Sequence, residues 1–385
     1  MKADILNALS QALTKINVGQ GHGSSFLECS VAFRQLDNLP DFKVAVEGEP
    51  RFSVFDGKMH HLAQTGTIIS RKDIGVWLIW RALNTNAETA VDDLWRYLSR
   101  RSVSAFQIME IEGLYVECSD ETYELQGGIK IVSAYNAPVR HIREEGLKPV
   151  SNGMSGFLVR PVTLTRTIGD TEDHLKAEFT DFSDLEDIRL LLSLVVRQGY
   201  QAISTFVVAA DSVPWLGGVS RHLHSRRSPV SMGPPIIGIS VRQADELMTK
   251  FRRLTGSQRE KLRVPLEKLN EHWAEGGLVQ SAIDLRTCVE ALYLDGNKEG
   301  EFKFRLSLRA ANYEGGDLQT RQESLKAIKQ AYDQGSKAVH TGKVSRSKES
   351  MDAMKKTAEL ARSAIIRRLD DPDIDWPSFE LSPRE

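Results

Sequence analysis

Cysteine is scarce in this chain of 385 residues. The three cysteines, Cys29, Cys118 and Cys288, are far apart and include no CxxC pair. Such a set cannot build a disulfide framework or a structural zinc site, because both need several thiols at suitable spacings. The composition suits a reducing compartment. We therefore expect a cytoplasmic protein without a structural metal.

The chain also lacks an excess of charge and a long apolar run. Lys and Arg number 50 against 52 Asp and Glu, so the formal net charge is −2. Any binding to nucleic acid must then come from a local basic patch. No stretch approaches the roughly 18 apolar residues of a membrane helix, and the amphipathic start carries Asp4 inside what would be a signal core. We expect neither a signal peptide nor contact with a membrane.

Several motifs with known chemistry are missing or stand in the wrong context. The sequence contains no P-loop, no Ser-His-Asp elbow and no paired-carboxylate glycosidase pattern, so we predict no cofactor. The glycines at 19, 21 and 23 follow a predicted helix, which indicates a turn and not a dinucleotide loop. His60-His61 has no carboxylate at ligand spacing and is interpreted as a solvated pair. Residues 373–385 are interpreted as a disordered acidic tail.

The pattern along the chain predicts an α+β protein of about two domains, on the usual prior of about 150 residues per domain. After a short opening helix, residues 24–70 alternate apolar and polar side chains as antiparallel strands do. A helical stretch over 73–101, in which the tryptophans are expected in the core, is followed by strand patterns and by a capped helix at 183–199. Between two of these strand patterns, Gln126-Gly127-Gly128 is a candidate hairpin turn. Prolines and glycines cluster in 213–238. We therefore place a mixed, mainly antiparallel β sensor or regulatory domain at 1–225 and a helical domain at 240–372.

The second domain shows helical periodicity almost throughout, which predicts an up-down bundle. In its last helix the apolar positions step by three and four, and lysines and arginines occupy the outer face. The predicted helices are Val241–Arg253, Ser257–Ala274, Leu278–Leu294, Glu301–Tyr313, Arg321–His340 and Ser347–Leu369.

The most distinctive segment is 332–342, at the end of the fifth predicted bundle helix. A stripe of Leu325, Ile328, Tyr332, Gly335 and Val339 should be buried. Residues three or four apart are neighbours on a helix surface, so Ser336, Lys337 and His340 should share an adjacent polar face with Asp333. An imidazole one turn from an ammonium and a hydroxyl is suited to acid–base work on phosphate.

This segment resembles the signature of HEPN domains, in particular the Apea-like group, in which a Tyr-Asp-x-Arg-Ser-x-x-Val-His-Gly pattern closes the third main helix. The stretch 281–292, which contains Glu290-Ala291-Leu292, is similar to the family's first helix, and 302–313 is similar to the second. The resemblance covers about 240–372. It implies a metal-independent endoribonuclease or toxin of bacterial antiviral defence. In such enzymes the ribose 2′-OH attacks the adjacent phosphate and the bond to the 5′-oxygen breaks, which leaves a cyclic phosphate and a free 5′-OH. The resemblance gives His340 the role of general acid or base.

One departure from the family pattern affects the activity directly. The family's arginine position, five residues before His340, is Gly335, and the one cation in the preceding six residues is Lys337. Lysine is a mobile point charge and does not replace the planar guanidinium fork. Arg305 or Arg309 from the neighbouring helix could supply the charge. Alternatively, the domain binds RNA, nucleotide or a protein partner without cutting, or it is a structural dimerisation module. Helix propensity predicts that Gly335→Arg would stabilise the protein by about 1 kcal/mol.

Two further expectations concern partners. The dense cluster Arg221, Arg226 and Arg227, together with Lys343, could contact an RNA backbone, although the cluster is also interpretable as a solvated linker. HEPN sites in the resembling family are usually composite. The resemblance therefore implies a homodimer through the C-terminal helical domain, in which two His340 side chains face a shared groove.

Overall fold

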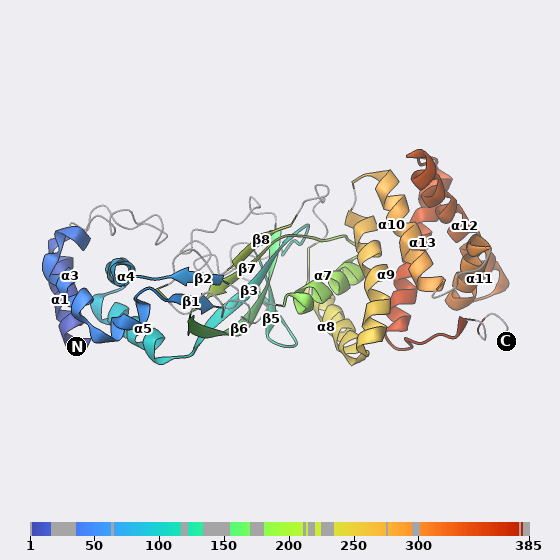
Figure 1. The fold of residues 1–385 in the computed structure, drawn as a ribbon. Helices are drawn as coiled ribbons and strands as arrows, with labels where there is room; N and C mark the ends of the chain where they lie inside the picture. The colour runs from blue at the N-terminus through green and yellow to red at the C-terminus, as the bar shows by residue number, and fades with distance from the viewer. Residues whose placement is uncertain are drawn as a thin grey trace.

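The computed structural model describes residues 2–16, 36–62, 65–116, 122–133, 155–169, 181–210, 213–214, 220–224, 235–274, 276–294, 301–376 and 379. N-terminal helices form one end of the molecule, an antiparallel sheet forms the middle and a helical bundle forms the other end (Figure 1). The mixed α+β class predicted from the sequence is confirmed. No helix in the described ranges combines the length and the apolar character that a bilayer crossing requires.

The N-terminal end is more helical than its alternating pattern indicates. It contains α1 (Lys2–Lys15), η2 (Leu36–Asn38), α3 (Pro40–Gly48), η3 (Pro50–Phe55), α4 (Arg71–Asn84) and α5 (Ala87–Ser99). The expectation of strands is wrong for 36–55, and 24–35 lie outside the described residues. The reason is local: Pro40 and Pro50 each occupy a first helical turn, where the missing N–H costs nothing. Phe42 and Val46, four residues apart, then pack on one side of α3.

The sheet is antiparallel throughout its described pairs, in the order β2-β1-β6-β3-β7-β8, and β5 pairs with both β4 and β6. Its strands are β1 (Met59–Leu62), β2 (Thr65–Ile68), β3 (Ser102–Glu112), β4 (Thr122–Leu125), β5 (Ile129–Ser133), β6 (Ser155–Gly169), β7 (Gln201–Ala209) and β8 (Ser220–Leu223). Gly127 and Gly128, with φ of 81° and 73°, form the predicted β4–β5 turn.

The helical bundle matches its predicted boundaries to within three residues at every end. It consists of α8 (Gly238–Arg253), α9 (Gly256–Ala274), α10 (Leu278–Tyr293), α11 (Phe302–Glu314), α12 (Leu318–Thr341) and α13 (Lys348–Arg368). Gly342 ends α12 with φ of 63°, and the Asp317 and Ser347 side chains cap the starts of α12 and α13.

The hydrophobic core does not divide at the predicted junction of 213–238. Helix α7 (Ser183–Val196) packs against α8 and α9, and its apolar residues share one core with the sheet and the bundle. A second core lies among the N-terminal helices and reaches the opposite end of the long strands. Strand β3 contributes to both, with Val103 and Ala105 in the second core and Met109 and Ile111 in the first. The cores therefore meet along the sheet.

The described residues of the predicted acidic tail, 373–376 and 379, differ from the prediction of disorder. Lys250 pairs with Asp370 at 2.7 Å, and Gln258 donates to Asp373 at 2.6 Å. Trp376 is buried, and its ring lies 5.7 Å from that of Tyr293 and 5.8 Å from that of Tyr313 between ring centroids. Residues 370–376 and Phe379 therefore form a strap on the bundle. The buried indole of Trp376 anchors this strap, because burial of a large aromatic ring contributes more free energy than most single contacts do.

Candidate functional site

The end of α12 presents the polar face that the sequence predicts. Asp333, Lys337 and His340 are exposed, and Ser336 is half-buried. Asp333 pairs with Lys303 of α11 at 2.6 Å. His340 lies in the last turn of α12. The buried face differs from the predicted stripe at Val339, which is 53% exposed, whereas Ala331 and Ala338 are buried.

Gly335 lies at the contact between α12 and α10. A Cβ at this position would be 2.6 Å from Cβ of Arg286 and 2.7 Å from the carbonyl oxygen of Ala282. The backbone oxygen cannot yield as a flexible side chain would. The expected stabilisation by Gly335→Arg is therefore wrong, because helix propensity is outweighed by a steric conflict between two packed helices. The glycine lets α12 lie close to α10, and the family's arginine has no room here.

Arg309 of α11 does not take the place of the motif arginine. Arg309 is 2% exposed. Its Nη1 donates to the carbonyl of Tyr293 at 2.7 Å, and its guanidinium lies 5.5 Å from the ring centroid of Trp376. Arg305 is half-buried on the same helix. Lys303, near the start of α11, is opposite Asp333, so His340 lies seven positions, about 10 Å of helix, beyond it. The prediction that Arg309 joins His340 is corrected by its burial.

Four exposed cations precede and follow His340 in the sequence. Lys337 belongs to α12, Lys343 and Arg346 lie in the turn to α13, and Lys348 begins α13. Within the described part of the chain, none of these four side chains has an ion-pair or hydrogen-bond partner. Other lysines of the same helices are paired, as Lys326 is with Glu349 and Lys356 with Glu323. The end of α12 therefore carries positive charge that the described residues leave unneutralised.

The predictions for His60-His61 and for the basic cluster of 221–227 can be compared with the structure to different extents. His60 and His61 are buried in β1, so the interpretation as a solvated pair is wrong. His60 stacks on Phe55 with 4.9 Å between ring centroids, and burial lowers its pKa to about 4. Arg221 belongs to β8, but its side chain lies outside the described part of the structure. Arg226 and Arg227 lie outside the described residues.

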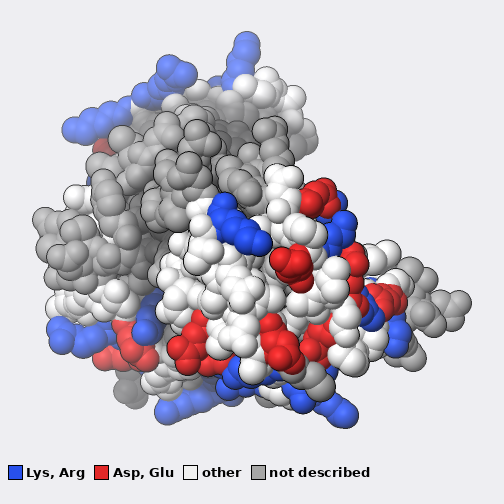
Figure 2. Space-filling view, turned by 90° about the vertical axis from the view of Figure 1, so that its left-hand side faces the viewer, with Lys and Arg blue, Asp and Glu red and all other residues white. Residues whose placement is uncertain are grey.

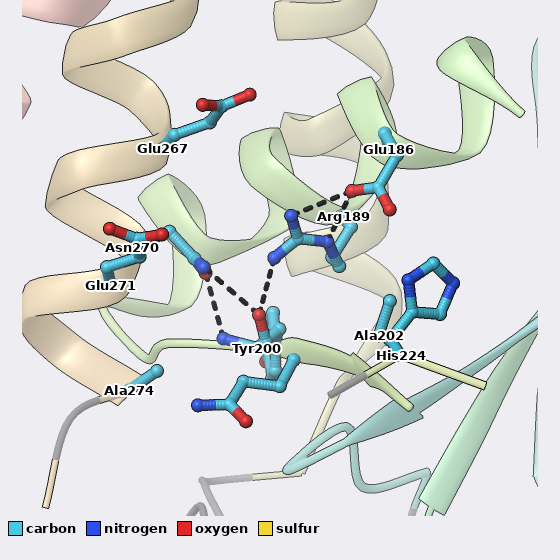
Figure 3. A pocket seen from close by; sticks show the side chains of 10 residues that line it. Glu186, Arg189, Tyr200, Ala202, His224, Glu267, Asn270, Glu271 and Ala274 are labelled. Atoms are coloured by element: carbon cyan, nitrogen blue, oxygen red, sulfur yellow. Dashed lines mark hydrogen bonds and ion pairs between the residues drawn. The ribbon is translucent and has the colours of Figure 1, made fainter. Parts of the chain in front are cut away.

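The sequence reasoning missed a polar cavity of about 270 Å³ between the sheet and the bundle. Its frame joins three elements. Asn270 of α9 accepts from the backbone N–H of Tyr200 at 2.8 Å and donates to the carbonyl of Tyr200 at 3.0 Å. Arg189 of α7 donates to the same carbonyl at 2.5 Å and to Glu186 at 2.8 Å (Figure 3). These bonds fix the segment that leads into β7 against both helices.

Carboxylates occupy the α9 wall of this cavity. Glu267, Asn270, Glu271 and Ala274 recur at helical spacing and line it together. Glu271 pairs with Lys268 at 2.5 Å. Burial, together with the negative charges of Glu271 and Glu186, raises the pKa of Glu267, although Arg263 and Arg189 act in the opposite direction. In the sequence this pattern is indistinguishable from a solvated helix face, because the β7 wall comes from a distant segment.

Comparison with known proteins adds no identification. No protein family, curated protein or solved structure matches the chain. The likeness to HEPN domains therefore rests on the residues of the helical region quoted above. Any function must be inferred from the geometry of the chain itself.

Proposed function

We propose that the C-terminal helical region is a HEPN-like module that binds RNA at the end of α12 and does not cut it by the family's Arg–His mechanism. The observation that carries this proposal is the set of cations Lys337, Lys343, Arg346 and Lys348, which flank His340 in the sequence and are exposed and without carboxylate partners in the described part of the chain. Phosphate is the partner such cations favour, because its binding releases condensed counterions. The α+β region at 1–225 would act as the sensor or regulator.

The lack of cleavage follows from the packing of two residues. Gly335 cannot be replaced by a longer residue without moving α10, and Arg309 is held by Tyr293 and Trp376. A general acid or base at His340 would then work without a fixed guanidinium to stabilise charge on the phosphate. Losing one such group typically costs about 10²–10³ in rate. Binding therefore fits the site better than catalysis.

A metal-independent endoribonuclease is the second candidate, and Arg286 favours it. Cβ and Cδ of Arg286 occupy the space beside Gly335, so this side chain approaches the position that the family gives to its arginine. Its guanidinium is at present bonded to Glu290 at 2.9 Å and lies 4.8 Å from the ring centroid of Tyr332. In this candidate, RNA binding would release Arg286 from Glu290 toward the phosphate.

Binding and cleavage of a labelled single-stranded RNA, measured with EDTA present, distinguish the two candidates. We expect anisotropy to show binding that weakens several-fold in Lys343→Ala and Lys337→Ala, and the salt slope to fall by about 1 for each phosphate-binding cation removed. Lys326→Ala is the matched control, because Lys326 is an exposed lysine of α12 that is paired with Glu349. Cleavage that disappears in both His340→Ala and Arg286→Lys would establish the nuclease instead. Absence of binding at low salt would refute both.

Dimerisation belongs to the same proposal. Two copies of this basic end facing each other would double the charge over one groove, and Val339 beside His340 offers exposed apolar surface at the same place. An isologous interface of this kind should bury on the order of 1,200–2,000 Å². Light scattering should show a dimer at micromolar concentration, and Val339→Asp should shift it toward the monomer. A strict monomer in the unmodified protein would rule out the composite site.

A further inference from the structure

The cavity between α7, β7, β8 and α9 has rigid walls that are independent of the proposed RNA surface. Besides the bonds of Asn270 and Arg189 to Tyr200, Gly199 lies directly against α9, where a Cβ would be 2.0 Å from the backbone nitrogen of Ala274. The chain therefore approaches the helix as closely as glycine allows. A cavity held in this way is largely preformed, as small-molecule sites usually are.

The three carboxylates that line the cavity differ in their partners. Arg189 is fully engaged, because its Nε and Nη2 contact Glu186 and its Nη1 donates to Tyr200. Glu271 pairs with Lys268, which also pairs with Asp284 at 3.0 Å. Glu267 has no hydrogen bond or ion pair within the described part of the chain, and it stands apart from the bonded groups in Figure 3. The cavity thus combines an arginine whose three nitrogens are already bonded with a half-buried carboxylate that has no hydrogen-bond or ion-pair partner among the described residues.

We propose that this cavity binds a small organic cation, an alkylammonium or guanidinium group, with Glu267 as its counter-ion. Glu186 and the side-chain oxygen of Gln201 can accept further N–H donors from the other walls. A bound cation would offset the repulsion that Glu186 and Glu271 exert on Glu267, the same repulsion that raises the pKa of this carboxyl.

Other ligand classes fit less well. An anion would meet three glutamates, while the one lining arginine is already bonded. A metal ion needs several convergent ligands, and no group of three or more His, Cys, Asp or Glu in the described ranges is placed to hold one. The volume of about 270 Å³ is slightly below the usual range for drug-sized ligands. It suits a small diamine, a guanidino compound or the end of an arginine side chain.

The position of the cavity gives its ligand a structural effect. Its lining comes from α7, from the start of β7, from His224 after β8 and from α9. A cation bound to Glu267 would therefore connect the bundle to the edge of the sheet. Because a ligand that binds the folded state alone stabilises it by mass action, saturation should raise the Tm of the whole chain.

Calorimetry and thermal unfolding of the full chain test the proposal with defined probes. Agmatine and putrescine represent free cations, an acetylated and amidated Gly-Arg-Gly peptide represents a protein side chain, and 1,4-butanediol and inorganic phosphate are the neutral and anionic comparators. We expect at least one cationic probe to bind and raise the Tm, with the stronger of agmatine and the peptide identifying the source. Binding should weaken as the pH falls, because protonation of Glu267 competes with the cation.

Variants separate a binding role from a structural one. Glu267→Gln should weaken cation binding at least tenfold and yet raise the Tm of the ligand-free protein, because it removes an unpartnered carboxylate that burial disfavours. Glu260 is an exposed glutamate on the same helix, so Glu260→Gln should change neither the cation binding nor the Tm of the ligand-free protein. Failure of all three cationic probes at millimolar concentration, equal binding by Glu267→Gln, or equal binding of butanediol or phosphate would overturn the proposal.

Discussion

At the residue scale, Gly335 shows how one contact can outweigh a local preference. Its helix would be better served by almost any other residue, since glycine costs about 1 kcal/mol relative to alanine in a helix interior. The neighbours Arg286 and Ala282 nevertheless leave space only for hydrogen. The position therefore serves the α10–α12 contact, and the family's motif is not recoverable there by a single substitution.

We predict that Gly335→Ala destabilises the protein by about 1–3 kcal/mol, the usual cost of overpacking. Gly256→Ala is the matched control, because Gly256 is also helical and has open space where its Cβ would lie. That change should be neutral or stabilising. Thermal unfolding followed by circular dichroism measures both, and a Gly335→Ala variant as stable as the Gly256→Ala variant would contradict the packing argument.

His60 gives the protein a stability that depends on pH. Burial lowers its pKa from 6.5 to about 4, so the unfolded state binds the proton more tightly than the folded state. Stability contributed by the neutral ring is therefore full above about pH 6.5 and is lost as the pH falls toward 4. We expect protonation of His60 to lower the free energy of unfolding by about 2–3 kcal/mol over this pH range. His60→Phe should flatten urea-midpoint profiles between pH 7 and 4, and an unchanged profile would exclude the assignment.

At the element scale, the C-terminal strap shows that acidic composition alone does not predict disorder. Asp370 is bonded to Lys250 of α8, and Asp373 is bonded to Gln258 of α9. Trp376 follows and packs at the ends of α10 and α11. There the indole covers the guanidinium of Arg309. One aromatic residue thus orders the segment, because its burial outweighs the entropy lost by the few residues around it.

Removal of that anchor should be costly. We expect Trp376→Ala to lower the free energy of unfolding by about 3–5 kcal/mol, as large aromatic truncations do. Asp371→Asn, an exposed change in the same segment, should lower it by less than about 0.5 kcal/mol. Chemical denaturation measures both free energies. A cost for Trp376→Ala as small as that of the control would show that the strap contributes little to the fold.

At the scale of the whole molecule, α7 links the sheet to the bundle. It has buried residues on nearly every side, and Arg362 of α13 reaches back to the carbonyl of Leu194 near its end. The N-terminal end of the molecule faces the viewer in Figure 2. There acidic and basic side chains surround a largely uncharged centre, without a continuous basic surface among the residues drawn in colour. The proposed RNA surface at the end of α12 and the helices around α1 lie at opposite ends of the molecule (Figure 1).

Because the core crosses the predicted junction, a fragment beginning at Gly238 should not behave as an independent domain. It would expose the faces of α8 and α9 that pack against α7. We expect this fragment to bind a hydrophobic dye, and we expect the sheet and bundle of the full chain to unfold in one calorimetric transition. A soluble fragment that melts cooperatively without binding dye would instead support the predicted two-domain division.

The sequence by itself determined the bundle helices, the polar face of Asp333, Lys337 and His340, and the β4–β5 turn, because periodicity, capping residues and glycine conformations act over a few neighbouring positions. It did not determine the helices of 36–55, where alternation over a short window resembles both structures. Only the tertiary structure decided that Gly335 packs against Arg286, that Arg309 lies beside the ring of Trp376 and that Glu267 lines a cavity together with the start of β7. Each of these depends on segments distant in sequence, and no local pattern records which of them meet.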